Sequence, residues 1–201
     1  MYLGNQLLRS ASEEVEYTPE LIGEFVKCKE DILYFAEKYF KIITIDEGEV
    51  LISLWDFQRK VLKSLVDPSP KRNVIILSPR QASKTTLSTI YILHYAVFNK
   101  DKRIAILANK ENTAIEILER VKLAYQYLPY WMQPGIKTGG WNKKEVVMGN
   151  GCIILASSTA SDGIRGKTVN CLTGNNKITI RNKKTGKIEE LSFLELERKL
   201  K

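Results

Sequence analysis

The 201 residues are enough for one mid-sized domain with its own core and a small appendage. With 44% hydrophobic and 27% charged residues, the composition is that of a folded, water-soluble chain. No apolar run approaches the roughly 20 residues that a membrane helix needs. The N-terminus lacks the basic-then-apolar pattern of a secretion signal, so we expect a cytoplasmic protein without membrane contact. Three scattered cysteines, Cys28, Cys152 and Cys171, argue against a disulfide framework or a zinc site.

The net charge of +8 is unevenly spread along the chain. Residues 171–201 hold 8 Lys and Arg against 4 Asp and Glu, so half of the excess lies in this short segment. The preceding 170 residues are only mildly basic, and their basic residues form no stripe with interleaved aromatics. A nucleic-acid binding module without catalysis is therefore a poor interpretation of the main body.

Helices are predicted in the first third of the chain. Thr18-Pro19 has the form of a helix start, with a capping hydroxyl and a proline in the first turn. Apolar residues on one face predict a helix over 31–41, and Gly48 interrupts the pattern. A further helix is predicted over 56–66, ended by a Pro-rich stretch.

An alternation of strands and helices follows. The β-branched run 73–77 is typical of a strand buried in a parallel sheet, and a polar turn then leads into a predicted helix over 84–98. A second buried strand is predicted over 103–108, and a long helix over 114–128. Strand, turn, helix, strand and helix in this order indicate an α/β fold with a parallel sheet.

The rest of the chain is predicted to be largely β-structure. A Gly-Asn-Gly turn at 149–151 predicts a hairpin between 145–148 and 152–155, followed by a loop over 157–167. After Cys171 the alternation stops. A small basic hairpin is predicted over 177–191, and a short helix over 193–200.

The turn between the strand at 73–77 and the helix at 84–98 has the spacing of a phosphate-binding loop, although serines stand at both glycine positions. Its backbone N–H groups and the helix dipole would hold phosphate, Lys84 would reach the β- and γ-phosphates, and the Thr85 hydroxyl would coordinate Mg²⁺. The alternative is a plain strand-to-helix turn with a serine cap and an exposed lysine. The predicted nucleotide-binding residues are Ser78, Pro79, Arg80, Gln81, Ala82, Ser83, Lys84, Thr85 and Thr86.

The helix start at Asp56-Phe57-Gln58 lies roughly 20 residues before this loop and can supply an adenine clamp. In such a clamp an aromatic ring stacks on the base and the Gln58 amide reads its edge. The alternative is an ordinary helix whose aromatic residue belongs to the core.

In this order the motifs resemble the large terminase subunits of tailed bacteriophages, which pump DNA into capsids. The similarity covers about residues 25–170 and is carried by CKEDILYFAEKYFKI, LWDFQRKVL, LSPRQASKTT, IAILANKENTAIEILERVKLAYQYLP and SSTASDGIRGKTVN. It implies an incomplete P-loop ATPase sheet of the ASCE type, with ATP and Mg²⁺ as cofactors. It also implies double-stranded DNA, the portal and the small terminase subunit as partners, and a homo-oligomeric ring in the cytoplasm of an infected bacterium.

The resemblance further implies roles for two arginines. Arg80 would sense the γ-phosphate, and Arg165 would serve as an arginine finger for a neighbouring subunit. The alternatives are a surface position for Arg80 and a loop-anchoring role for Arg165. The family's next strand, which ends in Asp-Glu and holds Mg²⁺ and the attacking water, does not follow Asn170. We therefore expect weak ATP binding and little hydrolysis by this chain.

The segment that begins at Cys171 resembles the opening of an intein, through CLTGNNKITI and KTGKIEELSFLELERKL. In such a segment the Cys171 sulfur attacks the Asn170 carbonyl to give a thioester, the first step of protein splicing. A Thr-x-x-His activating block is not present, and His94 is the chain's only histidine. The resemblance implies a split intein completed by a chain that holds its remainder and the rest of the terminase. A segment of 31 residues cannot bury a core alone, so we expect it to fold on docking.

The predicted organisation is an N-terminal helical region at 1–54, the first part of a P-loop ATPase domain at 55–170, and an N-terminal intein segment at 171–201. Three alternatives stay open for the last part: an unrelated tail after an ordinary core cysteine, a truncated gene, and a contiguous intein of which this chain holds only the beginning. For the whole chain the alternative is a helicase-like P-loop ATPase with a tail that does not splice.

Overall fold

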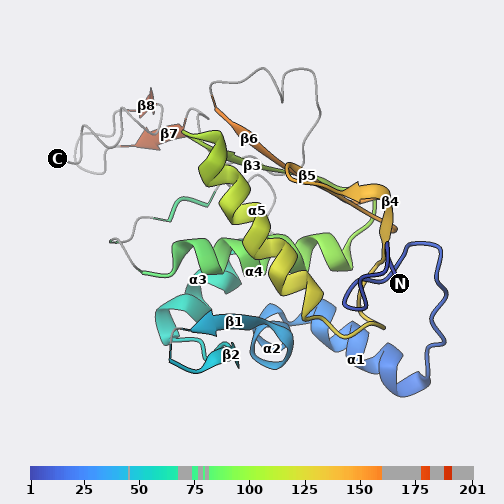
Figure 1. Cartoon of the computed structure of the whole chain (residues 1–201). Coiled ribbons are helices and arrows are strands. Elements are labelled where there is room, and N and C mark those ends of the chain that lie inside the picture. The colour runs from blue at the N-terminus through green and yellow to red at the C-terminus, as the bar shows by residue number, and fades with distance from the viewer. Residues whose placement is uncertain are drawn as a thin grey trace.

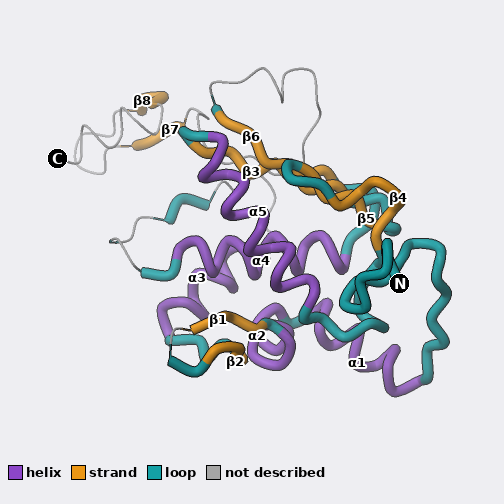
Figure 2. Tube along the Cα trace, viewed as in Figure 1, coloured by secondary structure: helices purple, strands orange, loops and turns teal. Residues whose placement is uncertain are grey.

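The computed structural model describes residues 1–44, 46–67, 74–76, 79 and 82–159, together with the backbone of 178–181 and 188–191. A four-stranded sheet lies on one side of the main body, and the helices are stacked beneath it (Figures 1 and 2). The elements are α1 Pro19–Glu30, α2 Ile32–Tyr39, β1 Lys41–Thr44, β2 Gly48–Leu51, α3 Asp56–Val66, α4 Lys84–Phe98, β3 Arg103–Ala108, α5 Glu111–Gln126, β4 Ile136–Trp141, β5 Glu145–Met148, β6 Ile153–Ser158, β7 Ile178–Arg181 and β8 Ile188–Leu191.

The predicted helix starts are confirmed at α1 and α2. The Thr18 hydroxyl accepts a hydrogen bond from the Leu21 N–H at 3.4 Å, and Asp31 caps α2 by accepting from Leu33 at 2.8 Å. Helix α2 ends at Tyr39, sooner than predicted, because the chain continues into the antiparallel hairpin β1–β2. That hairpin was not predicted. Its strands have four residues each and contain no fully buried residue, and they carry no clear apolar alternation.

The main sheet is mixed, with strand order β3–β6–β5–β4. The prediction of a parallel sheet is therefore wrong for most of it: β3 and β6 pair in parallel, whereas β5 pairs antiparallel with both β6 and β4. The predicted turn at 149–151 is confirmed, and it makes β6 antiparallel to β5. Strand β4 was missed because its sequence, with two adjacent glycines, lacks a strand pattern.

The predicted buried strand over 73–77 is wrong in the part that the structure describes. Residues 74–76 form no strand, and Val74 and Ile75 are 38% and 46% exposed. An apolar β-branched run forms a strand only when a neighbouring strand accepts its backbone hydrogen bonds. Among the described residues no strand pairs with this segment.

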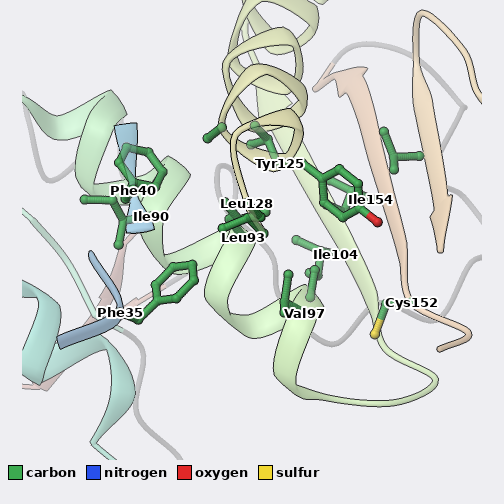
Figure 3. Packing of buried hydrophobic residues seen from close by; sticks show 14 of the residues in the cluster. Phe35, Phe40, Ile90, Leu93, Val97, Ile104, Tyr125, Leu128, Cys152 and Ile154 are labelled. Carbon is green, nitrogen blue, oxygen red and sulfur yellow. The ribbon is translucent and has the colours of Figure 1, made fainter. Parts of the chain in front are cut away.

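The core lies on both sides of α4. Figure 3 shows Leu93 of this helix between Phe35 of α2 on one side and Ile104 and Ile154 of the sheet on the other. All four side chains are at most 2% exposed. Helix α5 packs against α4 and against β3 and β6. A single cluster of buried residues thus includes side chains from both sides of the predicted boundary at 54/55.

Gln133 connects the N-terminal segment around Leu7 and Arg9 to the residues that follow α5 through side-chain hydrogen bonds. Its side chain is buried; Oε1 accepts from the Arg9 N–H at 3.0 Å, and Nε2 donates to the carbonyls of Leu7 and Leu128 at 3.0 and 3.1 Å. Residues 9–11 continue beside the first residue of β4, Ile136, as a short parallel bridge.

The predicted C-terminal hairpin is confirmed as β7 and β8, which pair antiparallel with Ile178 opposite Leu191. The predicted helix over 193–200 lies outside the described residues, as does most of the predicted loop over 157–167. Within the described part of the chain, no helix combines the length and the apolar character needed to cross a lipid bilayer.

Candidate nucleotide-binding site

The predicted phosphate loop ends at Ser83, which has a left-handed backbone conformation with φ 54° and ψ 23°. This conformation is uncommon for a residue with a side chain and is the one that glycine adopts freely. Ser83 occupies the second glycine position of the motif. The backbone at this position therefore has a conformation that glycine adopts more readily than serine.

Helix α4 starts directly after this turn, at Lys84 as predicted. Its first N–H groups have no partners within the helix, and Ser83 makes no side-chain cap bond to them. The positive end of the helix dipole adds to these donors. Backbone N–H groups at a helix start that follows a left-handed turn suit an anionic group such as phosphate.

The Lys84 side chain reaches back to Pro79. Its Nζ donates a hydrogen bond to the Pro79 carbonyl oxygen at 2.7 Å. Both residues lie in the predicted motif, so the ammonium group lies beside the backbone of a motif residue. Thr85 and Thr86, the predicted Mg²⁺ ligand and its neighbour, are half-buried in the first turn of α4. Of the predicted residues, the structure places the Lys84 ammonium group against Pro79, and Ser83, Lys84 and Thr85 follow one another at the start of α4.

Gln58 is the third residue of α3 and is 4% exposed. Its Oε1 accepts the Trp55 N–H at 2.9 Å, so the amide oxygen closes the start of the helix. Helix α3 packs against α4. The hydrogen bond from the Trp55 N–H fixes the orientation of the Gln58 amide and occupies its oxygen.

Two exposed aromatic residues, Trp55 and Phe57, lie close to the buried Gln58 in the sequence. Trp55 is 65% exposed and Phe57 is 40% exposed, with ring centroids 5.8 Å apart. The alternative that Phe57 is an ordinary core residue is therefore wrong. Exposed aromatic rings are available to stack on a planar ligand. Trp55 was not predicted as a site residue, because the sequence pattern around it fits a helix packed in the core equally well.

The other predicted site residues lie outside the described residues. They are Ser78, Arg80, Gln81, Arg165, Asn170 and Cys171. Of the described residues, no three His, Cys, Asp or Glu side chains gather as a metal site. The Mg²⁺ prediction therefore depends on the Thr85 hydroxyl together with the phosphates of a nucleotide.

The two described cysteines are poor nucleophiles. Burial raises the pKa of the Cys28 thiol to about 12, helped by the nearby Glu24 carboxylate. Burial also raises the pKa of Cys152, whose Sγ donates to the Asn99 carbonyl at 3.3 Å. A thiol with a raised pKa holds little thiolate at neutral pH. Neither of the two thiols is therefore a candidate nucleophile.

No protein-family model matches the chain.

Proposed function

We propose that residues 1–170 are the N-terminal part of a terminase-type DNA-packaging ATPase and that they bind ATP with Mg²⁺ at the loop before α4. The observation that carries this proposal is the left-handed turn at Ser83 immediately before the helix start at Lys84. It supports a phosphate-binding loop over a plain capped turn, because a serine that merely capped the helix would accept an N–H with its hydroxyl.

In this proposal Lys84 exchanges its bond to the Pro79 carbonyl for the β- and γ-phosphates of ATP. The backbone N–H groups at the start of α4 hold the phosphate oxygens, and Thr85 places its hydroxyl towards Mg²⁺. Bound Mg²⁺ would neutralise part of the phosphate charge. Arg80 would contact the γ-phosphate from the loop, and Arg165 would act on the nucleotide of a neighbouring subunit.

The adenine end of the site would lie at the start of α3. Trp55 and Phe57 offer exposed ring faces for stacking, and Gln58 offers its amide nitrogen to the base edge. The capping bond to Trp55 holds that amide in one orientation. The Gln58 side chain would thus serve both the helix and the base.

ATP hydrolysis needs more than these residues supply. The strand that ends in Asp-Glu in the resembling family is not found before Cys171. We therefore propose that this chain binds nucleotide without efficient turnover, and that DNA translocation, with the portal, the small terminase subunit and a ring of copies, belongs to the completed ATPase.

We propose that Cys171 completes the ATPase by protein splicing. Its thiolate attacks the Asn170 carbonyl carbon, a C–S bond forms as the C–N bond breaks, and the released amine takes up a proton. A nucleophile at the far end of the intein then takes the acyl group. Cyclisation of an asparagine would release the intein. The remaining intein residues come, in this proposal, from a complementary chain.

The second candidate function is a helicase-like P-loop ATPase whose tail does not splice. Both candidate functions use the loop at Ser83 and Lys84 to bind nucleotide. They differ in the role of Cys171, which has no chemical function in the helicase-like ATPase. Only the splicing proposal predicts a new covalent species when the complementary intein sequence is added.

Nucleotide binding is tested by titrating the full chain with a fluorescent ATP analogue. Lys84→Ala should weaken binding at least about tenfold, because the charge that meets the phosphates is lost. Lys100→Ala is the matched control: Lys100 is exposed just beyond the other end of α4 and should leave binding unchanged. Equal affinities for Lys84→Ala and the parent chain would refute the site.

A further inference from the structure

The peptide group between Leu54 and Trp55, just before α3, is held at both of its ends by side chains of that helix. Arg59, the fourth residue of α3, donates its Nε–H to the Leu54 carbonyl at 3.2 Å. The Trp55 N–H of the same peptide group donates to Gln58 Oε1 at 2.9 Å. The Arg59 backbone N–H also donates to the Trp55 carbonyl at 3.0 Å. The conformation of the chain at this helix start therefore depends on Arg59 as well as on Gln58.

The Arg59 guanidinium group is in turn held by α2. Its Nη2 donates a hydrogen bond to the Glu37 carboxylate and forms an ion pair with it, and α2 packs against α3. A guanidinium group is planar, so bonds at both Nε and Nη2 leave it little freedom to rotate. The two side chains are 39% and 33% exposed, and ion pairs at such positions add little to the free energy of folding. The main consequence of this pair is therefore the fixed direction of the guanidinium group.

This helix start is also where the chain passes from the core to the surface. Leu54 is buried, whereas the next residue, Trp55, is exposed and offers its ring to the base in the proposed site. A rotation of the Leu54–Trp55 peptide group would move the Trp55 ring, and it would break the bond that orients the Gln58 amide. The ring and the amide that we assign to the base thus both depend on the direction of one peptide group.

The phosphate end of the proposed site is held by other contacts. Ser83 and Lys84 lie at the start of α4, and the Lys84 ammonium group is bonded to the Pro79 carbonyl. These contacts involve α4 and the loop before it, not α2 or the start of α3. A change at the ion pair of Glu37 and Arg59 should therefore act on base binding and leave phosphate binding as it is.

We infer that Glu37 is a positioning residue for nucleotide binding. Through Arg59 it fixes the Leu54–Trp55 peptide group, and with it the two side chains that recognise the base. The inference rests on the proposed function for its ligand, and it adds a residue of α2 that makes no contact with that ligand. Glu37 contributes to the affinity for the adenosine part of ATP and not to the affinity for the triphosphate.

The test compares ATP with inorganic tripolyphosphate, each titrated into the full chain in the presence of Mg²⁺ by calorimetry. The ratio of the two dissociation constants measures the contribution of the adenosine part. Glu37→Ala should weaken ATP binding by about fivefold and change tripolyphosphate binding by less than about twofold. Glu37→Gln keeps a neutral acceptor for Arg59, so its affinity for ATP should lie between those of Glu37→Ala and the parent chain.

A double substitution shows whether Glu37 acts through Arg59. Arg59→Met keeps an apolar stem and removes both bonds of the guanidinium group, so it should weaken ATP binding at least as much as Glu37→Ala. Adding Glu37→Ala to Arg59→Met should cause no further loss, because the residue that transmits the effect is gone. Glu49→Ala is the matched control. The Glu49 carboxylate pairs with Lys41 across the β1–β2 hairpin at 3.7 Å, and its removal should leave both affinities unchanged.

Three outcomes would overturn the inference. Glu37→Ala could leave ATP binding unchanged, or it could weaken the binding of both ligands equally, as a purely structural effect would. Its effect could also add in full to that of Arg59→Met. A parent chain that binds neither ligand would instead refute the proposed function. A parent chain that prefers ATP, with the same ratio of dissociation constants in Glu37→Ala, would remove the role of Glu37 and leave the nucleotide site standing.

Discussion

The Lys84 ammonium group donates a 2.7 Å hydrogen bond to the Pro79 carbonyl, and both residues belong to the same predicted phosphate loop. The lysine ammonium group therefore lies beside the Pro79 backbone. A carbonyl oxygen carries only a partial charge, so phosphate oxygens are the stronger partners. Binding of ATP should replace this bond without a large movement of α4.

The first prediction concerns the strained turn at Ser83. Ser83→Gly should leave the free energy of unfolding unchanged or raise it by up to about 1 kcal/mol, because a left-handed conformation costs a side chain about 1–2 kcal/mol and glycine loses entropy on folding. ATP binding should be retained. Urea unfolding and the fluorescent-nucleotide titration measure the two effects.

Ser88→Gly is the matched control for that substitution, because Ser88 lies inside α4. There the change should lower stability by about 0.5 kcal/mol. If Ser83→Gly destabilised the chain as much as Ser88→Gly, the Ser83 side chain would be stabilising the fold. Position 83 would then not be one at which the backbone favours glycine.

The second prediction concerns His94, which is 8% exposed and whose Nε2–H donates to the Cys28 carbonyl at 2.9 Å. Burial lowers its pKa below the ordinary value of 6.5. As the pH falls below 6.5, His94 is therefore protonated in the unfolded chain before it is protonated in the folded chain. Stability should be fully present above about pH 6.5 and should fall by up to about 1.4 kcal/mol per pH unit below it.

His94→Gln tests this directly, because glutamine can donate to the same carbonyl and does not titrate. Unfolding by urea at a series of pH values should give a shallower acid slope for the variant. His94 is the only histidine, so no other imidazole contributes to the difference. Identical slopes would show that the imidazole is protonated inside the fold.

The third prediction concerns Gln133, which joins the N-terminal segment to the end of α5. Gln133→Ala leaves the Arg9 N–H and the carbonyls of Leu7 and Leu128 without their partner, and we expect a loss of about 2–3 kcal/mol. Amide exchange at Arg9 should accelerate. Gln6→Ala, at an exposed position in the same segment, should change neither quantity. Unchanged protection of Arg9 in Gln133→Ala would contradict this account.

The fourth prediction concerns the cysteines. At neutral pH iodoacetamide should modify Cys171 in the folded chain much faster than Cys28 or Cys152, because burial raises the pKa of both of those thiols. Peptide mapping after short reaction times measures the order. Adding urea should bring the three rates together. Early modification of Cys28 or Cys152 in the folded chain would remove the chemical selectivity on which the splicing proposal depends.

Local signals in the sequence were sufficient for several elements. The bounds of α3, α4 and β3 were predicted correctly, because a proline-rich stop, a loop motif and a short β-branched run mark them within a few residues. The hairpin turn at 149–151 was also predicted, because Gly and Asn select a tight turn. These signals need no knowledge of distant contacts.

Features that depend on distant partners escaped prediction. Strand β4 forms because β5 and residues 9–11 lie beside it, and nothing within its own sequence indicates a strand. The segment at 74–76 has the opposite property: its sequence favours a strand, but no described strand pairs with it. The exposure of Trp55 and Phe57 could not be read from a pattern that fits a core helix equally well.

Cys171 is, in this proposal, the residue at which splicing removes residues 171–201 and joins residues 1–170 to the rest of the ATPase. The most direct measurement is intact-mass analysis after the chain is mixed with a polypeptide that completes the intein and continues the ATPase. The account predicts a ligated product that contains residues 1–170 and lacks residues 171–201, and none with Cys171→Ala. A chain that keeps its full mass, with neither a thioester-linked nor a ligated species, would contradict it.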